Sequence, residues 1–446
     1  ELLMAVASIL AINVTGQLDE NAKDLLTMRV RNRASYVQEI LRNAEDLEQL
    51  SEQITATTQQ LLKSGDISLD TLDNSSEQSD ALLVALAPQL LDTLRTKQVT
   101  GIFLILNTHD LDTCEVGKKM PGIYLRDMDP DARPSERNSD LLLERASATV
   151  VKELAIGTDK GWQPAFPYQG DTKGGILRTV FQTAYKGDAG LSAESYGRWT
   201  TNSYCLAGDD RHAIAYSMPL ILPDGTVYGV VGVELLTDYL QTKLPFTELD
   251  EDKAGTYFIV TTTDDALTDG VLTLRKTVTS GEDLVTADAP LGVLNCRSNG
   301  NGGWVELNDK RYYMVLEPLQ VYNRNAPFAA EKWFLAGTME QSVLLAFSSR
   351  VREVLLTTIA ITLVLSVLGS LLVSARLARP INRLYREVID AQEKKTFPRL
   401  SRTAIREVDR FAETITELNK ELVTNSTKFL RIMDMASVEL GGYELR

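Results

Sequence analysis

The sequence predicts an α+β protein that is anchored in a membrane. Its parts are a long N-terminal helix, two antiparallel-sheet units in series, a transmembrane helix and a helical coiled coil. Three observations predict this order. A heptad-spaced apolar stripe follows the N-terminus, β-rich runs separated by turn residues fill the middle, and one long uncharged stretch lies near the C-terminal end. Heptad spacing is typical of a helix that packs along one stripe, and β-rich runs between turns are typical of strands.

The chain begins with an apolar segment, Leu2 to Val14, which is too short to cross a bilayer alone. We expect residues 1–17 to be the end of a first transmembrane helix, with a trimmed signal peptide as the alternative. Residues 18–62 continue as a long stalk or dimer helix, because apolar positions recur three and four residues apart. This stripe faces a partner helix, the protein's own domain, or each in turn. Its members are Val37, Ile40, Ala44, Leu47, Ser51 and Ile54.

The next unit, residues 63–240, mixes helices and strands. The run GIFLIL at 101–106 predicts a buried strand, and 139–154 has the apolar spacing of a helix. The strongest local signal is a hairpin, in which two β-rich runs flank Pro223-Asp224-Gly225 and the glycine supplies the positive φ of the turn. Two glycines in the second run predict that another backbone or a ligand comes close.

A second and smaller unit, residues 241–345, has the same texture. Its segments TYFIVTTT, GGWVELNDKRYYMVLEPL and KWFLAGTM are rich in β-branched and aromatic residues and predict antiparallel strands. The run SNGNGG at 298–303 predicts a turn. Residues 341–350 are expected to lead as a helix directly into the uncharged stretch that comes next.

This uncharged stretch, Val354 to Ala375, is long enough for a transmembrane helix, which needs about 20 apolar residues. The alternative is a buried helix of a soluble protein, although such a helix normally carries a polar stripe. Residues 376–446 hold 14 basic and 11 acidic residues, whereas residues 1–375 hold 32 and 50. The positive-inside bias therefore places 376–446 in the cytoplasm and 18–353 outside.

Composition excludes several functions. The large acidic part argues against nucleic-acid binding, which needs a basic surface. Three cysteines, Cys114, Cys205 and Cys296, do not make a disulfide framework; one disulfide stays open and its pairing undecided. Two histidines and no CxxC spacing predict neither a metal site nor a cofactor. Because no nucleophile motif or nucleotide-binding loop is present, we expect no enzyme in this segment.

After the span, residues 376–425 contain two short heptad segments joined by a polar connector with Pro398. Two such helices can pack in parallel as a four-helix bundle in a homodimer. Their apolar positions are Ile381, Leu384, Val388 and Ala391 in the first, and Val408, Phe411, Ile415, Leu418 and Leu422 in the second.

This order of segments resembles a bacterial double Cache (dCache) transmembrane sensor with a HAMP linker and a truncated cytoplasmic output region. The hairpin AYSMPLILPDGTVYGVVGVEL resembles the Cache signature, and APFAAEKWFLAGTMEQSVLL resembles the end of a membrane-proximal Cache unit. ARLARPINRL and IREVDRF resemble HAMP. The resemblance implies two PAS-like Cache units, with 63–240 distal and 241–345 proximal to the membrane.

The last residues, 426–446, resemble the start of a PAS-like or output module. Outputs in sensors of this build are diguanylate cyclases, histidine kinases or chemotaxis signalling domains. None of their catalytic motifs is present in the sequence. The resemblance therefore implies an output domain but does not say which reaction it performs.

The resemblance also implies a ligand site in the distal unit. Double Cache receptors for amino acids use an Arg, then Trp-Tyr, an Ala, a later Tyr, and an Asp on the glycine-rich strand. Here Arg178 and Ala184 match, but Val180 replaces the Trp and Phe181 the Tyr. This departure puts specificity for amino acids in doubt.

Further along, Tyr204 stands where the later Tyr is expected, although Leu206 replaces a nearby acid, and Glu234 stands at the Asp position. Trp199 is amphipathic and suits a pocket rim. The expected ligand-binding residues are Arg178, Phe181, Trp199, Tyr204 and Glu234.

Each expected contact has a chemical reason and a structural alternative. An Arg can hold a carboxylate with two parallel bonds, so Arg178 suits an acid; a surface ion pair is the alternative. Glu234 lies amid buried apolar positions and can pair with an ammonium, unless strand alternation turns it to water. The three aromatic residues can instead be core or loop packing.

We therefore expect a homodimeric, multi-pass receptor of the plasma membrane. It senses a small extracellular solute, which is an amino acid, amine or carboxylate, and passes the signal through HAMP to an output domain. Its other contacts are membrane lipid and no nucleic acid. The alternative function is a membrane-anchored adhesion protein or protein–protein interaction scaffold without small-molecule sensing.

Overall fold

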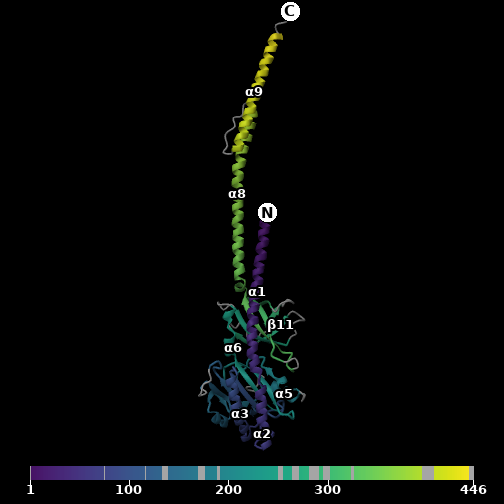
Figure 1. Cartoon of the computed structure of the whole chain (residues 1–446), viewed down its shortest axis with the longest axis vertical. Helices are drawn as coiled ribbons and strands as arrows, with labels where there is room; N and C mark the ends of the chain where they lie inside the picture. Colours follow the sequence, from purple (N-terminus) through teal and green to yellow (C-terminus); the bar gives the residue numbers. More distant parts are fainter. Residues whose placement is uncertain are drawn as a thin grey trace, which may run out of the picture. The chain divides into compact units, whose positions relative to one another are not determined.

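The computed structural model shows an α+β protein with a long N-terminal helix (Figure 1). Contacts divide the chain into two units, Val14–Ser349 in one and Glu1–Asn13 with Arg350–Arg446 in the other. The residues that the structure describes are 2–74, 76–115, 117–132, 139–168, 176–187, 191–249, 255–263, 271–280, 291–294, 302–322, 326–393 and 406–440.

The N-terminal helix is interrupted, so the prediction of one continuous helix over 18–62 is wrong. Helix α1 covers Leu2–Glu45 and α2 covers Glu48–Ser64. Leu47 lies between them and is buried in the core, while the Glu45 side chain accepts a hydrogen bond from Trp199. We attribute the break to these two contacts, which hold the residues on either side of it against the core.

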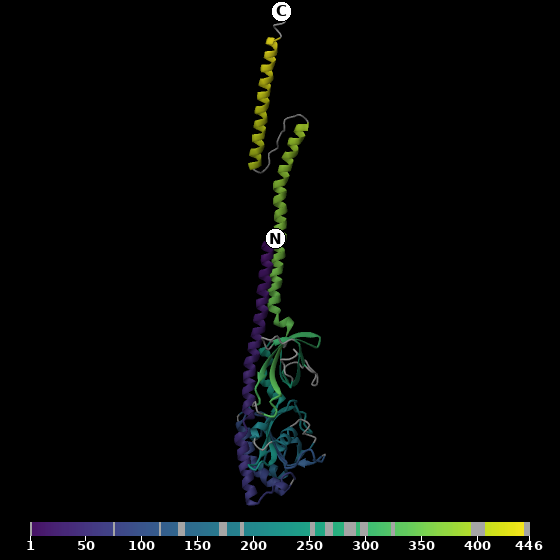
Figure 2. The same cartoon turned by 90° about the vertical axis from the view of Figure 1, so that its right-hand side faces the viewer.

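The heptad stripe of this helix faces the protein's own sheets. Val37, Ala44, Leu47 and Ile54 are buried in one core together with strand residues. Figure 2 shows α1 beside both sheets. Of the two interpretations of the stripe, packing on the protein's own domain is therefore the one seen.

The distal unit is built on a sheet with the strand order β5-β4-β3-β1-β9-β8-β7. Its neighbouring strands are antiparallel except for β4 and β5, which are parallel. The strands are β1 (Gly101–Leu106), β3 (Gly122–Asp127), β4 (Leu141–Arg145), β5 (Gly157–Gln163), β7 (Arg198–Trp199), β8 (Ala213–Ile221) and β9 (Val227–Leu236). The helices are α3 (Glu77–Thr96), α4 (Ala148–Leu154), α5 (Arg178–Tyr185) and α6 (Thr237–Lys243). A small separate ladder joins β2 (Lys119–Met120) to β6 (Phe166–Pro167).

Residues 139–154 do not form the single helix that their spacing predicts. The first part is β4, which pairs with β3, and α4 begins only after Ser147, whose hydroxyl oxygen accepts a hydrogen bond from the Val150 N–H. Three consecutive leucines in β4 cause the error. A strand covered on both faces shows no alternation, so periodicity alone cannot distinguish it from a buried helix.

The predicted hairpin is confirmed as β8 and β9, joined by a turn in which Gly225 has a φ of 87°. The glycines of β9 do allow a close approach. A Cβ added at Gly229 would lie 2.5 Å from the carbonyl oxygen of Ile105 in β1. The close neighbour at this position is therefore a backbone of the same sheet.

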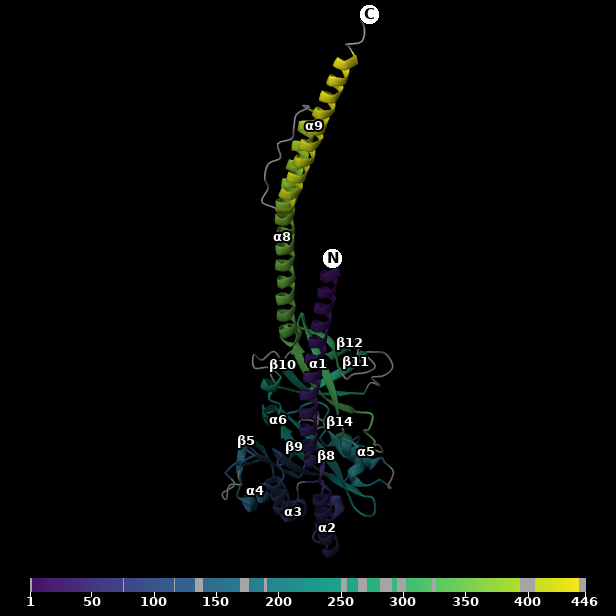
Figure 3. The same cartoon turned by 45° about the horizontal axis from the view of Figure 1, so that its top comes forward.

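The two faces of the distal sheet carry separate cores because side chains alternate along each strand. Val231 and Val233 of β9 join the core that includes α1, α2 and α3. Val230 joins the other core, which includes Phe103, Tyr124 and α5. Figure 3 shows α3 and α4 on one side of this unit and α5 on the other. We name these two sides the α1 face and the α5 face.

The proximal unit has a six-stranded sheet in the order β12-β11-β10-β15-β14-β13. All neighbouring strands in this sheet are antiparallel. The strands are β10 (Gly255–Thr262), β11 (Val271–Ser280), β12 (Leu291–Leu294), β13 (Gly302–Leu307), β14 (Lys310–Leu319) and β15 (Lys332–Glu340). The three predicted runs match β10, β13 with β14, and β15, whereas β11 and β12 were not predicted. The expected turn at 298–303 lies mostly outside the described residues.

Helix α1 approaches the proximal sheet closely at one point. A Cβ added at Gly337 of β15 would lie 2.3 Å from Cγ2 of Val30. Nearby, Arg33 donates to the carboxylate of Glu248, and Gln38 donates to the backbone carbonyl of Gln320 at 2.6 Å. One helix is thus bonded to the proximal unit and buried in the core of the distal unit.

The second unit contains α8 (Ala346–Glu393) and α9 (Arg406–Leu440). In the described residues one helix is long and apolar enough to cross a membrane; it is the segment Ala346–Ala391, whose most apolar 18-residue window has a mean hydropathy of 2.3. Before it, α7 (Gln341–Leu344) is a separate short helix, so the predicted helix over 341–350 is broken.

The C-terminal helices differ from the expected boundaries. Helix α8 continues through position 380, where a separate helix was expected to begin, and α9 continues beyond 425 to residue 440. The connector at 394–405 and the residues 441–446 lie outside the described part. Cys114 and Cys205 are free thiols, and Cys296 also lies outside it.

Candidate functional site

Two of the five expected ligand residues meet on the α5 face of the distal sheet. The Glu234 side chain is fully buried. The Tyr124 hydroxyl donates a hydrogen bond to Glu234 and lies 2.7 Å from the hydroxyl of Tyr204. Phe181 belongs to the same core and stacks on Tyr185 at a centroid distance of 5.6 Å. The alternative in which Glu234 points to water is therefore wrong.

The other two expected residues do not reach this group. Arg178 begins α5 and is half-exposed, and its guanidinium donates to Asp112 at 2.6 Å and to the Tyr168 hydroxyl at 2.9 Å. Trp199 lies in the core of the α1 face, where its indole N–H donates to Glu45 Oε1 at 2.6 Å. The side chains of Trp199 and Glu234 therefore lie on opposite faces of the distal sheet.

The residue at the centre of the buried group is Arg126 of β3, which was not predicted from the sequence. Its Nε donates to Glu234 Oε1 at 2.7 Å and one terminal nitrogen donates to Oε2 at 2.9 Å, which is a bidentate pair. The other terminal nitrogen donates to Glu144 at 2.8 Å and to Asp209 at 2.5 Å. Arg126 is itself fully buried.

A second arginine extends this group toward the surface. Arg211 donates to Asp209 at 2.7 Å, to Glu144 at 2.8 Å and to Asp159 at 2.8 Å. Arg126, Arg211, Glu234, Glu144, Asp209 and Asp159 are named here the ionic cluster. Four carboxylates therefore share two guanidinium groups under the α5 face.

A glycine makes room for this arrangement. Gly101 of β1 pairs with Arg126 on one side and with Glu234 on the other. A Cβ at this position would lie 2.7 Å from Glu234 Oε1. A sequence signal for the ionic cluster does exist, because an arginine interrupts the apolar run GIYLRD, but its partner follows only from the strand register.

Burial and ion pairing shift the pKa values of the ionic cluster in opposite directions. Burial by itself lowers the pKa of Arg126, but attraction to Glu234 outweighs it, so the pKa is raised and the guanidinium keeps its charge. Burial raises the pKa of Glu144 more than the two arginines lower it. Burial also raises the pKa of Asp209, but hydrogen bonds from Arg211 and Arg126 reverse the effect. Glu144 is therefore more easily protonated than Asp209.

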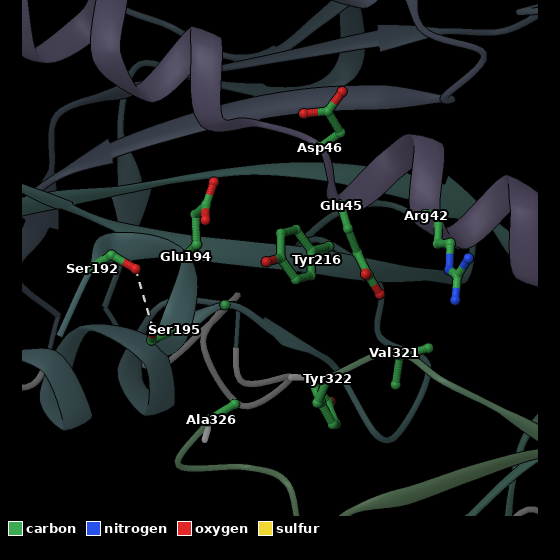
Figure 4. A pocket seen from close by; sticks show the side chains of 11 residues that line it. Arg42, Glu45, Asp46, Ser192, Glu194, Ser195, Tyr216, Val321, Tyr322 and Ala326 are labelled. Carbon is green, nitrogen blue, oxygen red and sulfur yellow. Dashed lines mark hydrogen bonds between the residues drawn. The ribbon is translucent and has the colours of Figure 1, made fainter. Parts of the chain in front are cut away.

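A separate cavity of about 300 Å³ lies on the α1 face, where α1 ends (Figure 4). Its walls come from the end of α1, the 3₁₀ turn at Ala193–Tyr196, strand β8 and the segment after β14. The lining residues are Arg42, Glu45, Asp46, Ser192, Glu194, Ser195, Gly197, Tyr216, Val321, Tyr322 and Ala326. We name it the junction cavity, because residues of both sheet units line it.

Glu45 in this cavity should make stability depend on pH. Burial raises the pKa of its carboxyl from 4.5 to about 7, although the bond from Trp199 opposes this. A raised carboxyl pKa means that the folded state binds the proton more tightly, so wild-type stability falls as pH rises from 4.5 to about 7. Glu45→Gln should therefore stabilise the protein at about pH 8 by up to about 3 kcal/mol, and most of this gain should vanish near pH 5.

Thermal unfolding of the full chain at the two pH values tests this expectation. Glu153→Gln is the matched control, since Glu153 is an exposed residue of α4. An equal gain from Glu45→Gln at both pH values would show that the ionised Glu45 carboxylate is not the destabilising species.

Fold and site together define an α+β protein with two antiparallel-rich sheets in series, one helix packed along both, and a buried ionic cluster in the first. No protein-family model matches the sequence, and no curated protein matches it either. Structures of sensory and ligand-binding domains from chemoreceptors and histidine kinases show some likeness to it.

Three of these structures illustrate the extent of the likeness. The periplasmic sensory domain of the Campylobacter jejuni chemoreceptor Tlp1 is 14% identical with a TM-score of 0.43, covering 73% of this chain and 98% of its own. The extracellular domain of the histidine kinase soHK1S-Z6 is 14% identical with a TM-score of 0.38, covering 74% and 98%. The ligand-binding domain of the Pseudomonas aeruginosa PAO1 amino acid chemoreceptor PctC, in complex with GABA, is 14% identical with a TM-score of 0.33, covering 72% and 99%. Likeness of this strength indicates no function by itself, so the proposed function rests on this chain's own residues.

Proposed function

We propose that the chain is the sensing part of a transmembrane receptor of the double Cache type. The distal unit binds a small extracellular solute, and the signal passes through α8 and a HAMP linker to a cytoplasmic output domain. The segment itself performs no covalent chemistry. This proposal includes a plasma-membrane location with residues 18–353 outside and 376–446 inside.

The observation that carries the proposal is the buried ionic cluster. Replacing a buried ion pair by well-packed apolar residues is often neutral or stabilising, so such a pair is weak evidence for a role in stability. Strongly coupled buried charges are instead frequent at sites that recognise a ligand or change state. The cluster lies on the sheet face that α5 covers, and it contains Glu234, one of the residues at which the resemblance implies a ligand contact.

The cluster also suggests the chemistry of the solute. Glu234 and Arg126 satisfy one another by two parallel hydrogen bonds. A zwitterionic solute offers the same two groups, so its ammonium can take the place of Arg126 at Glu234 while its carboxylate takes Arg126. Tyr124 and Tyr204 supply hydroxyls beside the pair. Arg178 and Phe181, both on α5, are proposed to complete the side of the site away from the sheet.

The C-terminal unit supports a relay through a second copy of the chain. Phe411, Leu418 and Leu422 of α9 are 66%, 55% and 63% exposed, although they lie at heptad spacing. Apolar stripes of this kind are buried when parallel helices pair. We therefore propose a homodimer in which these stripes meet. In α8 the apolar side chains over 354–373 are exposed as well, which suits contact with lipid.

A binding screen tests the proposal. The full chain in detergent is heated with single amino acids, amines and carboxylates, and a compound that binds the folded state raises the melting temperature. Glu234→Gln is expected to lower the affinity for a compound found in this way by about 10- to 100-fold, because it removes one partner of a charge-assisted bond. Asp73→Asn is the matched control, since Asp73 is a buried, ion-paired acid outside the cluster.

Two results would contradict this proposal. If none of the compounds shifts the melting temperature of the wild type, the sensing of a small solute of these classes is wrong. If Glu234→Gln and Asp73→Asn leave the affinity equally unchanged, the receptor binds its solute away from the ionic cluster.

A further inference from the structure

We propose that the junction cavity is a second binding site, which takes the ammonium group of a small organic amine. It is separate from the proposed solute site, because it lies on the α1 face of the sheet and the ionic cluster lies on the α5 face. Three independent features of its lining point to this chemistry.

The first feature is the hydroxyl group of Tyr216, which faces the cavity. Tyr216 is only 6% exposed; among the described residues no hydrogen bond to its hydroxyl is found, and the hydroxyl opens on the cavity rather than being sealed in the core. Gly197 leaves the space for this group, since a Cβ there would lie 1.8 Å from the hydroxyl oxygen. Figure 4 shows the Tyr216 hydroxyl inside the cavity, directed toward the side where Glu194 lies. Because the hydroxyl faces the cavity and has no protein partner there, it can bond a ligand that enters.

The second feature is the excess of negative charge. Glu45, Asp46 and Glu194 line the cavity, and Arg42 is its single basic lining residue among those described. Further acids, Glu48 and Glu52, lie near Glu194, and together with burial they raise the pKa of its carboxyl. Above a pH of about 7, where Glu45 is ionised, such a lining attracts a cation and repels a carboxylate or phosphate. Figure 4 shows Glu45 between Tyr216 and Arg42, so the Arg42 guanidinium does not fill the space beside the Tyr216 ring.

The third feature is the apolar part of the wall. Val321 and Ala326 line the cavity from the proximal unit, and the rings of Tyr216 and Tyr322 add aromatic surface. Small-molecule sites are commonly apolar cavities of about 300–1,000 Å³ with a few polar groups that fix orientation. Aromatic rings also attract an ammonium through their faces. An organic amine therefore suits the cavity better than a hydrated inorganic cation.

Equilibrium dialysis of the full chain in detergent with radiolabelled putrescine tests this proposal. The wild type is expected to bind putrescine saturably, and an excess of butyrate, which has a similar carbon chain and opposite charge, is expected not to compete. Tyr216→Phe removes only the hydroxyl, and Glu45→Gln removes the charge but keeps an acceptor for Trp199. Each is expected to weaken putrescine binding about tenfold or more.

Two control variants separate this site from other effects. Glu153→Gln removes an exposed acid on α4 and is expected to leave binding unchanged. Glu234→Gln is expected to leave putrescine binding unchanged as well, which distinguishes failure of this proposal from failure of the proposed solute site. Melting curves of each variant show whether it is folded.

Three outcomes would overturn the inference. The first is that the wild type binds no putrescine saturably. The second is that folded Tyr216→Phe and folded Glu45→Gln both bind putrescine as tightly as the wild type. The third is complete displacement of putrescine by Mg²⁺ at matched ionic strength. The last result would mean that the acidic surface merely attracts cations without a site for an amine.

Discussion

Replacing Arg126 with methionine is expected to destabilise the part of the protein that holds the two sheets by about 3–5 kcal/mol, because the change breaks a buried ion pair on one side only. Glu234 and Glu144 are fully buried and would each lose a guanidinium partner. Asp209 would keep only Arg211. Urea unfolding of the full chain in detergent, followed by circular dichroism, measures the change.

A second variant shows whether uncompensated charge is the cause. In the double variant Arg126→Met with Glu234→Gln, one buried carboxylate is neutralised, so part of the lost stability should return. Arg31→Met is the matched control, since Arg31 is 63% exposed and its pair with Glu317 should contribute no more than about 1 kcal/mol. A loss at Arg126 no larger than at Arg31 would mean that the ionic cluster is not buried as described.

Replacing Trp199 with alanine is expected to cost about 3–5 kcal/mol, because it empties a large buried volume. The ring is fully buried and lies at centroid distances of 5.7 Å from Tyr216 and 6.4 Å from Trp333. Its indole N–H also bonds Glu45. The same urea unfolding experiment measures the loss. Trp199 would then be a core residue that joins the two sheet units, and not a contact of a solute at Glu234.

The control for this prediction is Trp304→Ala. Trp304 is only partly buried at the proximal sheet, so its removal should cost clearly less. Trp199→Phe separates packing from hydrogen bonding, since it keeps most of the ring and removes the donor to Glu45. Suppose that Trp199→Ala lowers the free energy of unfolding no more than Trp304→Ala does, and also abolishes binding of a solute. Trp199 would then line the solute pocket, as expected from the sequence, and would not be a core residue.

The sequence predicted the strands whose limits are marked by turns. The β8–β9 hairpin was predictable because a glycine with positive φ stands between two β-rich runs. The strand β11 was missed because its sequence VLTLRKTVTS mixes charged and apolar residues without clear turns. The break after Glu45 was missed for another reason, since the contacts to which we attribute it include a bond from Trp199, which is distant in the sequence.

The candidate site was only half predictable for a similar reason. Glu234 stood out as an acid within an apolar run, and Tyr204 followed from the resemblance. Arg126 could not be paired with Glu234 in advance, because both are register partners of Gly101 and the register appears only in the folded sheet. Pairing likewise decides that Trp199, opposite Tyr216, lies on one face of the sheet and Tyr204, opposite Ala213, on the other.

The contact between Val30 and Gly337 limits how helix α1 can move. A displacement of α1 along its axis by one residue is about 1.5 Å, and it would carry the valine methyl group out of the recess that the missing glycine side chain leaves. Sliding is thereby opposed at the proximal sheet, whereas bending at the non-helical residues 46–47 leaves the recess filled. A displacement at the distal sheet would then tilt α1 about Val30.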